Sequence, residues 1–287
     1  MKLKRYTKDD YQAVCDFLVE LCRQDGRQIH WNWGRLEWMM VHPEFDQSLM
    51  SSIGLWMEGS RVVGAAIYDM YFGEAFCGVL PEYEALYPEI LDYAYRELKD
   101  DAGLGVAICD DAPEQIKAAQ AAGFVRAVQT ETVLKLELDR PLSAKLPEEL
   151  HFGELDPERD AEALQWLFWQ GFDHGADREE FEKTEEIIPR IRPHFNRHLS
   201  VAAVNEEGEP VSCCCLWFLE GTEYAYVEPV CTVPAWRGKG AAKAVIFEAL
   251  GRARALGAQR AIVLSDMAFY QKLGFVRERH YSFYWKP

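Results

Sequence analysis

The sequence predicts an α+β (mixed α/β) protein made of two similar domains in tandem, each with a mostly antiparallel mixed sheet flanked by helices. The first observation is an internal repeat. Residues 53–80 and 199–233 each contain three apolar runs separated by polar or glycine-containing turns, and each third run ends in Cys-x-Val. The second observation is that each half continues with a helical pattern and then a further strand. Together these patterns predict a mixed sheet with helices on both faces.

The remaining elements repeat in the same order in both halves. Each half opens with a strand that leads into a helix, and after the three strands each has a long helix, a strand, a short helix and a final strand. The opening segments are residues 2–22 and 150–172, the long helices 87–103 and 241–257, the closing segments 118–124 and 269–275, and the last strands 128–139 and 279–286. Apolar residues recur at helical spacing on one face of the second long helix: Ala244, Phe247, Leu250 and Ala253.

A linker is expected between the halves. Pro141 and Pro147 bracket residues 140–147, and proline breaks regular structure. We therefore divide the chain into a first domain over residues 1–142 and a second over residues 143–287.

Charge is distributed unevenly along the chain. Residues 229–287 carry 10 Lys and Arg against 3 Asp and Glu, whereas residues 1–228 carry 21 against 44, within a net charge of -16. The basic end suggests an anionic ligand, and the acidic remainder would repel a nucleic acid, so a small polyphosphate fits better. Charge alone leaves open that these cations form a solvated helix face.

Composition also sets the expected location and redox state. The N-terminus has no apolar signal region, and no apolar run approaches the roughly 20 residues that a membrane span needs. We expect a cytoplasmic protein with no membrane or nucleic-acid partner. The eight cysteines, three of them adjacent at 213–215, have no paired metal-ligand spacing, so we expect reduced, mostly buried thiols and no metal.

The loop "PAWRGKG" (234–240) lies between a strand and the helix that starts at residue 241. Free N–H groups at a helix N-terminus can cradle a phosphate, glycines allow close approach, and Arg237 and Lys239 would add charge-assisted contacts. The loop matches a P-loop poorly because no Ser or Thr follows Gly240, and it matches a dinucleotide fingerprint poorly because Lys243 stands where a small residue is needed.

Together with the motif that closes the second half, this loop resembles the GNAT superfamily of acyl-CoA-dependent N-acyltransferases. Arg237, Gly240 and Ala242 match the family pattern [Q/R]-x-x-G-x-[G/A], and Phe269 with Tyr270, before Gly274-Phe275, matches its aromatic-Tyr signature. The resemblance covers residues 148–287.

The resemblance implies a binding site for the co-substrate acetyl-CoA. The CoA pyrophosphate would lie on the amides of the loop: Gly238, Lys239, Gly240, Ala241 and Ala242. The pantetheine arm would pair with the backbone of Cys231, Thr232 and Val233. In this family the strand splays from its neighbour at this point, and Pro229 supports an irregularity here because proline removes a ladder donor.

Two residues are candidates for catalysis. The resemblance makes Tyr270 the general acid for the leaving thiolate, against the alternative of a packed helix tyrosine. Strand alternation places five residues on one face: Tyr224, Tyr226, Glu228, Val230 and Thr232. Glu228 is the candidate general base, since a carboxylate among tyrosines can have a raised pKa. An exposed strand glutamate is the alternative for Glu228, and Glu223 and Asp266 are weaker candidates for the base.

The first half lacks these features. When Pro81 is aligned with Pro234, Glu84 replaces Arg237 and Tyr87 replaces Gly240, and the closing "AQAAGF" has no tyrosine. We expect a degenerate domain that does not bind CoA. Its aromatic segment 30–45 could cover an acceptor cleft or pack the repeats together, and packing is favoured. The acidic run 177–186 is read as a solvated helix face, with attraction of a cationic acceptor as the alternative.

The sequence therefore predicts an acetyl-CoA-dependent N-acetyltransferase that acts on a small-molecule amine, with one active site in residues 143–287. The alternatives are a non-catalytic acyl-CoA-binding regulatory protein and a peptide or protein N-acetyltransferase. The oligomeric state stays open, a homodimer included.

Overall fold

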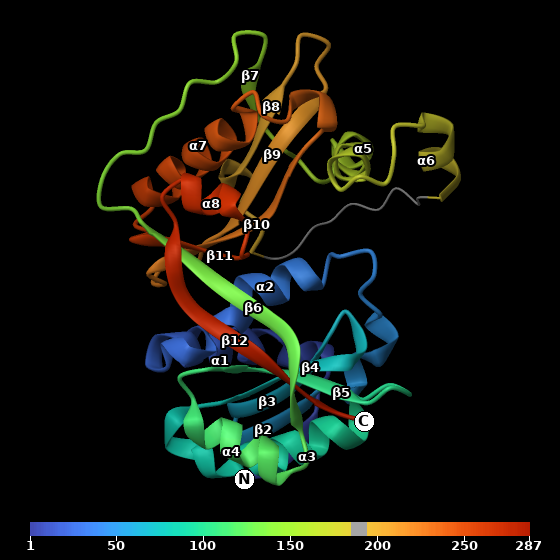
Figure 1. The fold of residues 1–287 in the computed structure, drawn as a ribbon, viewed down its shortest axis with the longest axis vertical. Helices are drawn as coiled ribbons and strands as arrows, with labels where there is room; N and C mark the ends of the chain where they lie inside the picture. Colours follow the sequence, from blue (N-terminus) through green and yellow to red (C-terminus); the bar gives the residue numbers. More distant parts are fainter. Residues whose placement is uncertain (185–193) are drawn as a thin grey trace. The chain divides into compact units, whose positions relative to one another are not determined.

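The computed structural model describes residues 1–184 and 194–287, which form two compact units (Figure 1). Unit 1 comprises residues 1–134 and 264–287, and unit 2 comprises residues 135–263. The sequence analysis divides the chain between residues 142 and 143. In the structure the C-terminal segment instead belongs to the same unit as the N-terminal half. Among the described residues, no helix combines the length and the apolar character that a bilayer crossing requires.

The sheet of unit 1 has the strand order β1-β2-β3-β4-β5-β12. Its pairings are antiparallel except for the parallel pair β4 and β5. The strands are β1 (Lys2–Arg5), β2 (Gly54–Glu58), β3 (Arg61–Asp69), β4 (Tyr71–Val79), β5 (Leu104–Cys109) and β12 (Val276–Lys286). A further strand, β6 (Val125–Glu137), begins in unit 1 and ends in unit 2.

Helices cover both faces of the unit 1 sheet. A Cβ on Gly64 of β3 would meet Ile90 of α3, whereas one on Gly78 of β4 would approach Leu21 of α1. Gly78 pairs with Ala65 and not with Gly64, so the two glycines face opposite sides, and α1 and α3 therefore lie on opposite faces (Figure 1). The α-helices are α1 (Tyr11–Gln24), α2 (Trp33–Met39), α3 (Tyr87–Glu97), α4 (Pro113–Ala121) and α8 (Ala268–Lys272). The 3₁₀ helices are η1 (Lys8–Asp10), η2 (Gly26–Trp31), η3 (Gln47–Ser52) and η4 (Pro81–Leu86).

The C-terminal strand completes the unit 1 sheet. β12 pairs antiparallel with β5, from Tyr281 opposite Cys109 to Lys286 opposite Leu104. Gly105 leaves space for the ring of Trp285, because a Cβ there would come within 2.7 Å of it. The N-terminal and C-terminal segments of the chain thus contribute to one hydrophobic core, that of unit 1.

Unit 2 has the strand order β11-β10-β9-β8-β7, with a parallel pair β10 and β11 and antiparallel pairs elsewhere. The strands are β7 (His151–Glu154), β8 (Ser200–Val204), β9 (Pro210–Trp217), β10 (Tyr224–Thr232) and β11 (Arg260–Leu264). The helices are α5 (Ala161–Gly171), α6 (Arg178–Thr184), α7 (Ala241–Ala255), η5 (Arg197–Leu199) and η6 (Pro234–Trp236). Figure 1 shows α7 and α5 on opposite sides of the β9–β10 pair.

The predicted fold class is confirmed: each unit is a mostly antiparallel mixed sheet flanked by helices. The predicted long helices correspond to α3 and α7, and the predicted short ones to α4 and α8. All eight cysteines are buried and unbridged, as expected for reduced thiols. Of the acidic run 177–186, α6 holds residues 178–184, and residues 185 and 186 lie outside the described residues.

Candidate active site

The loop before α7 has the backbone geometry of an anion cradle. Gly238 and Gly240 have φ of 74° and 95°, values that glycine adopts without the steric cost of a Cβ, and α7 begins directly after Gly240. Within residues 1–184 and 194–287, the N–H groups of Gly238, Lys239 and Gly240 donate no hydrogen bond. A Cβ on either glycine would meet no atom within 4 Å, so the loop borders open space. These amides can therefore bind an anion at a helix N-terminus.

Arg237 is fixed by three acceptors of its own unit. Its Nε donates to the carbonyl of Thr232 at 3.0 Å, and its Nη2 donates to the carbonyl of Gly171 at 2.9 Å. Its Nη1 lies 2.9 Å from a carboxylate oxygen of Asp173. This arrangement therefore favours a positioning role for Arg237 over the direct contact with a phosphate that the sequence analysis expects. The guanidinium instead links the end of β10 to the C-terminal end of α5.

The other two cations of the loop region rest on aromatic rings. The Lys239 ammonium lies 4.6 Å from the ring centroid of Trp236, and the Lys243 ammonium lies 5.3 Å from that of Phe247. In the described part of the chain neither lysine forms an ion pair, so both charges can act on an anion at the loop.

β10 contains a bulge that interrupts its regular pairing with β9. The register with β9 shifts between Val227 and Val230, around the cis peptide bond from Glu228 to Pro229. β10 pairs with β11 only from Tyr224 to Tyr226, so the two parallel strands part beyond that point. The strand irregularity suggested by Pro229 is present, and it lies where β10 and β11 separate.

The bulge also changes which residues share a face. Val227 lies opposite Leu216 and Val230 opposite Cys214, so three residues of β10 span two of β9. The predicted common face for Tyr226 and Thr232 is therefore wrong, because one inserted residue reverses the alternation beyond it.

Glu228 is half-buried at the bulge and contacts Tyr226. The hydroxyl of Tyr226 donates to the Glu228 carboxylate, and the backbone carbonyl of Glu228 accepts from Trp217 Nε1 at 2.8 Å. Tyr226 of β10 thus holds the carboxylate, and Trp217 of β9 holds the backbone of Glu228, where β10 separates from β11. Glu223 is exposed before β10, and its carboxylate lies 3.8 Å from Arg260.

Tyr270 lies on α8, in the segment assigned to unit 1. It is buried, and its ring centroid is 5.1 Å from that of Phe269 and 5.6 Å from that of Phe275. Asp266 is exposed just before this helix. The structure thus assigns Glu228 and the loop to unit 2, and Tyr270 and Asp266 to unit 1.

Two residues that sequence reasoning missed support the loop. Gly171 ends α5, and a Cβ there would lie 2.8 Å from both Cβ and Sγ of Cys231, so glycine lets the helix end approach β10. Asp173 adopts φ of 64°, a left-handed value that is uncommon for residues other than glycine. The only signal in the sequence is the run Gly-Phe-Asp after an apolar helix, which is typical of a helix C-terminus.

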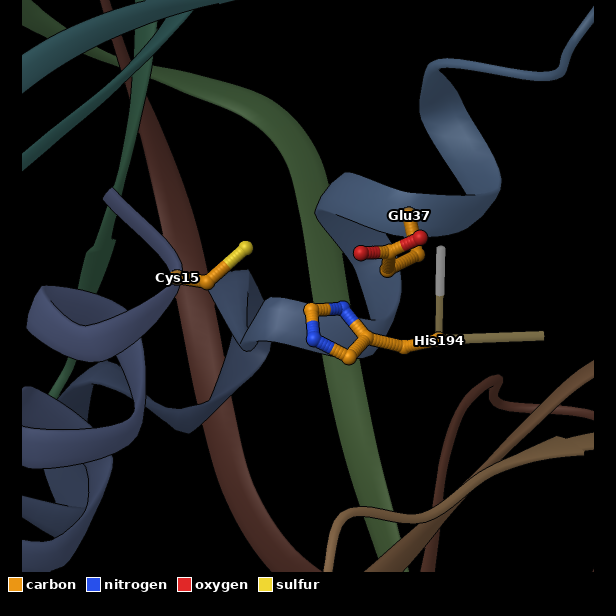
Figure 2. A group of neighbouring side chains, drawn as sticks. All are labelled: Cys15, Glu37 and His194. Carbon is orange, nitrogen blue, oxygen red and sulfur yellow. The ribbon is translucent and has the colours of Figure 1, made fainter. Parts of the chain in front are cut away.

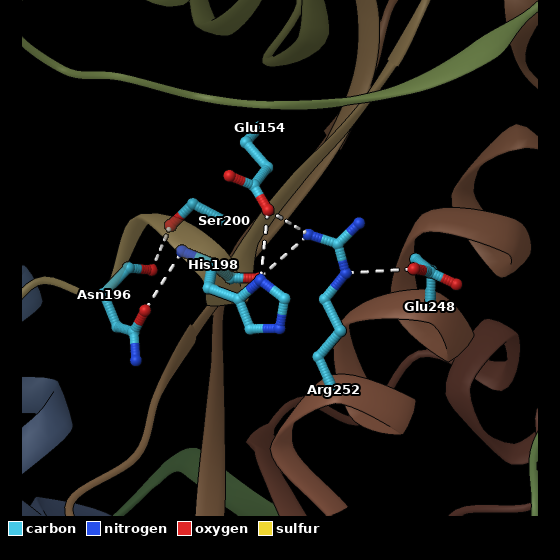
Figure 3. Close-up of polar contacts among 6 residues, drawn as sticks. All are labelled: Glu154, Asn196, His198, Ser200, Glu248 and Arg252. Atoms are coloured by element: carbon cyan, nitrogen blue, oxygen red, sulfur yellow. Dashed lines mark hydrogen bonds and ion pairs between the residues drawn. The ribbon is translucent and has the colours of Figure 1, made fainter. Parts of the chain in front are cut away.

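The far end of α7 is held by a polar network, which Figure 3 shows. Arg252 donates to Glu248 at 2.9 Å, to Glu154 of β7 at 2.8 Å and to the carbonyl of His198 at 3.0 Å. Asn196 caps the N-terminus of η5, because its side chain accepts a hydrogen bond from the His198 amide at 3.0 Å. The network fixes α7 to the edge of its sheet and so fixes the direction of the helix N-terminus.

The comparisons with known proteins agree with this geometry. Residues 161–275 match the acetyltransferase (GNAT) family model. This chain therefore carries a GNAT acetyltransferase domain. The matched segment contains α5, the bulged β10, the loop, α7 and Tyr270. No curated protein sequence matches the chain at a significant level.

Solved structures extend the likeness of the GNAT domain to the whole chain. A GCN5-related N-acetyltransferase from Sphaerobacter thermophilus is 16% identical with a TM-score of 0.59, over 99% of this chain and 95% of that one. A tandem GNAT protein from the clavulanic acid biosynthesis pathway is 15% identical with a TM-score of 0.62, over 99% and 98%. A GNAT-family acetyltransferase from Colwellia psychrerythraea is 14% identical with a TM-score of 0.56, over 100% of both chains. At these identities the likeness shows the fold.

Three further side chains with metal-binding atoms are drawn in Figure 2. Cys15 of α1 and Glu37 of α2 are buried in unit 1, whereas His194 belongs to unit 2. Because the three residues belong to different compact units, we do not infer a metal site from them.

Proposed function

We propose that the protein is an acetyl-CoA-dependent N-acetyltransferase that acetylates the amine of a small molecule. The observation that carries the proposal is the loop before α7. Its glycines are left-handed, and among residues 1–184 and 194–287 its amides have no acceptor and Lys239 and Lys243 have no ion pair, an arrangement that suits a pyrophosphate. A GNAT domain over residues 161–275 supports acyl transfer in general.

Different residues of unit 2 would bind the different parts of acetyl-CoA. The amides of residues 238–242 and the charges of Lys239 and Lys243 would hold the pyrophosphate. The backbone of residues 231–233, next to the separation of β10 from β11, would pair with the pantetheine arm. Arg237 is a positioning residue, because its three hydrogen bonds fix the start of the loop relative to α5.

The proposed reaction is direct transfer of the acetyl group. The amine nitrogen forms a bond to the acetyl carbon, and the bond from that carbon to sulfur breaks. Glu228 takes the proton that the amine loses, and the Tyr270 hydroxyl gives a proton to the leaving thiolate. Contact with Tyr226 orients the Glu228 carboxylate for this role.

The experiment is a measurement of CoA thiol release across a panel of small amines. Tyr270→Phe should lower kcat at least tenfold with acetyl-CoA affinity changed less than twofold, because the phenol acts on the leaving group and not on binding. Glu228→Gln should lower kcat and remove the basic group from the pH–rate profile. Glu223→Gln is the matched control, since that carboxylate is exposed and lies before the strand.

Other outcomes would redirect the proposal. Binding of acetyl-CoA without turnover of any amine would favour a regulatory acyl-CoA-binding protein. Turnover only with peptide amines would favour a peptide or protein acetyltransferase. Unchanged kcat in both Tyr270→Phe and Glu228→Gln would contradict the assigned catalytic roles.

A further inference from the structure

Unit 2 has a second hollow besides the loop, a groove along one face of α5. Its cavity volume is about 560 Å³, which is within the range of sites that bind small molecules. Four parts of the unit contribute to its lining: α5, α6, the turn between β8 and β9, and η6. The lining residues lie between Arg159 and Trp236, so the groove belongs to unit 2.

The groove borders the loop but not the carboxylate proposed for catalysis. Its lining includes Val211 and Val233, which are joined by a hydrogen bond from the Val233 amide to the Val211 carbonyl at 3.0 Å. Glu228 precedes Val233 by five positions on an extended strand, so the two are roughly 15 Å apart. Trp236 also lines the groove, and it lies only two residues before Gly238 of the loop. A ligand in the groove would therefore lie next to the anion cradle.

The cations around the groove already have carboxylate partners. The Arg159 guanidinium lies 2.6 Å from the Asp160 carboxylate, and Arg178 pairs with Glu162. Glu209 is exposed on the turn between β8 and β9, where water can solvate its charge. The described lining therefore offers no free cation for a phosphate, and we expect an uncharged part of a ligand to enter the groove.

Two half-buried indoles line the groove, Trp166 from α5 and Trp236 from η6. The Arg178 guanidinium lies 5.0 Å from the ring centroid of Trp166, and that ring also packs on Phe181 with centroids 5.2 Å apart. The Lys239 ammonium lies 4.6 Å from the ring centroid of Trp236. These contacts hold both rings in place. A flat aromatic group can pack on such fixed rings at a low cost in conformational entropy.

Gln170 adds a side-chain amide that can read the edge of such a ring. It lines the groove one helical turn after Trp166, and its amide forms no hydrogen bond within residues 1–184 and 194–287. A carboxamide offers a donor beside an acceptor, which matches the N6 donor and N7 acceptor of adenine. A plain hydrocarbon ring would leave this amide unused. The next residue, Gly171, accepts from Arg237, so Gln170 also lies beside the anchor of the loop.

We propose that this groove binds an adenine base, with the ring packed against Trp166 and Trp236 and its N6–N7 edge on the amide of Gln170. The base has two possible sources. One is the nucleotide end of acetyl-CoA, whose pyrophosphate would lie on the neighbouring loop, and the other is a free adenine nucleoside. The first source rests on the proposed function, whereas the site for the base does not.

The test is calorimetric titration of the full chain with adenosine and with inosine, which has the same size but carries an acceptor in place of the N6 donor. Adenosine should bind at millimolar or lower concentration and about tenfold more tightly than inosine, since one bidentate pair discriminates on this scale. Gln170→Met should abolish the preference for adenosine. Gln120→Met is the matched control, because Gln120 is exposed on a helix of unit 1, and it should keep the preference.

A titration of adenosine into the chain saturated with acetyl-CoA identifies the source of the base. Loss of adenosine binding would assign the groove to the adenine of CoA, and retained binding would assign it to a free nucleoside. Gly240→Ala should weaken acetyl-CoA and leave adenosine binding unchanged, so failure of the proposed function does not decide this test.

Trp236→Leu provides a second variant if Gln170→Met fails to fold, and it should weaken adenosine binding at least fivefold through loss of the aromatic contact. Absence of adenosine binding to the wild-type chain would overturn the proposal. Equal binding of adenosine and inosine, or an unchanged preference in Gln170→Met, would do the same.

Discussion

Arg237 fixes the loop before α7 through contacts within its own unit. Each of its three donor nitrogens has an acceptor inside unit 2, and two of these acceptors are backbone carbonyls. The guanidinium fork can reach all three, whereas a lysine ammonium is a compact point charge on a flexible stem. The pair with Asp173 is well exposed and contributes little by itself, so the two carbonyl bonds carry most of the positioning.

We predict that Arg237→Lys weakens acetyl-CoA binding about tenfold, or about 1.4 kcal/mol, because two backbone carbonyls lose their fixed donors. Asp173→Asn should weaken binding less than twofold. The dependence of affinity on salt concentration should stay the same in Arg237→Lys, but should flatten in Lys239→Ala. Calorimetry at several salt concentrations measures both quantities.

Arg254→Ala is the control, since Arg254 also donates to a backbone carbonyl, that of Leu138, but lies at the other end of α7. A flattened salt dependence in an Arg237→Ala variant would mean that this guanidinium contacts the phosphate directly.

His30 makes the stability of unit 1 depend on pH. Its pKa is about 3 in the folded chain, against an ordinary value of 6.5. Below pH 6.5 the unfolded chain takes up a proton on this ring that the folded chain excludes, so acid favours unfolding. The free energy of unfolding should fall by about 1.4 kcal/mol per pH unit from this residue as the pH drops below 6.5, and should not change above it.

Urea denaturation between about pH 7 and pH 5 measures this dependence, a window chosen above the ordinary range of carboxylate titration. His30→Gln should remove this part of the slope, whereas His151→Gln, on the exposed strand β7, should keep it. Parallel pH profiles for wild type and His30→Gln would show that the buried ring does not control the acid sensitivity.

At the level of elements, the sequence predicted which helices and strands form but not how far each regular pattern extends. Apolar periodicity located α3 and α7, and turn residues separated the strands of each half. Alternation in β10 failed beyond Glu228, because a bulge depends on pairing with β9 and leaves no periodic signal. Proline at position 229 was the one local sign of it.

The loop is the part of the site that the sequence predicted best. Two glycines flanked by cations at a strand-to-helix junction already indicate left-handed backbone and free amides, and both glycines have positive φ. The anchoring of Arg237 could not be predicted, since Gly171 and Asp173 lie more than sixty positions earlier in the chain. Such contacts follow from the tertiary fold and not from local spacing.

The sequence predicted that β12 is a strand, but it did not predict that this strand belongs to unit 1. Its alternating aromatic residues indicate a strand, and Tyr281, Phe283 and Tyr284 are buried as that pattern implies. Sequence order placed it with the second half, whereas its pairing with β5 places it in unit 1. A period-two pattern specifies a buried face but does not specify the neighbouring strand.

In the whole molecule, the two units differ in the features that binding of CoA requires. Unit 2 has the loop, and in the same position unit 1 has η4 (Pro81–Leu86), a 3₁₀ helix with Glu82 and Glu84 in its first turn and no glycine. In unit 1, His30 and Trp31 also fill the space beside Phe76 where β4 and β5 part. We therefore expect one acetyl-CoA per chain, bound by unit 2.

Calorimetric titration of the full chain with acetyl-CoA tests this account most directly, in wild type, Gly240→Ala and Gly221→Ala. The two glycines have similar φ of 95° and 91° and open surroundings, so the substitutions carry a similar backbone cost of about 1–2 kcal/mol, but only Gly240 lies in the loop. We predict one acetyl-CoA per chain in wild type, at least tenfold weaker binding in Gly240→Ala, and unchanged binding in Gly221→Ala. Two acetyl-CoA molecules per chain, or wild-type affinity in Gly240→Ala, would contradict the account.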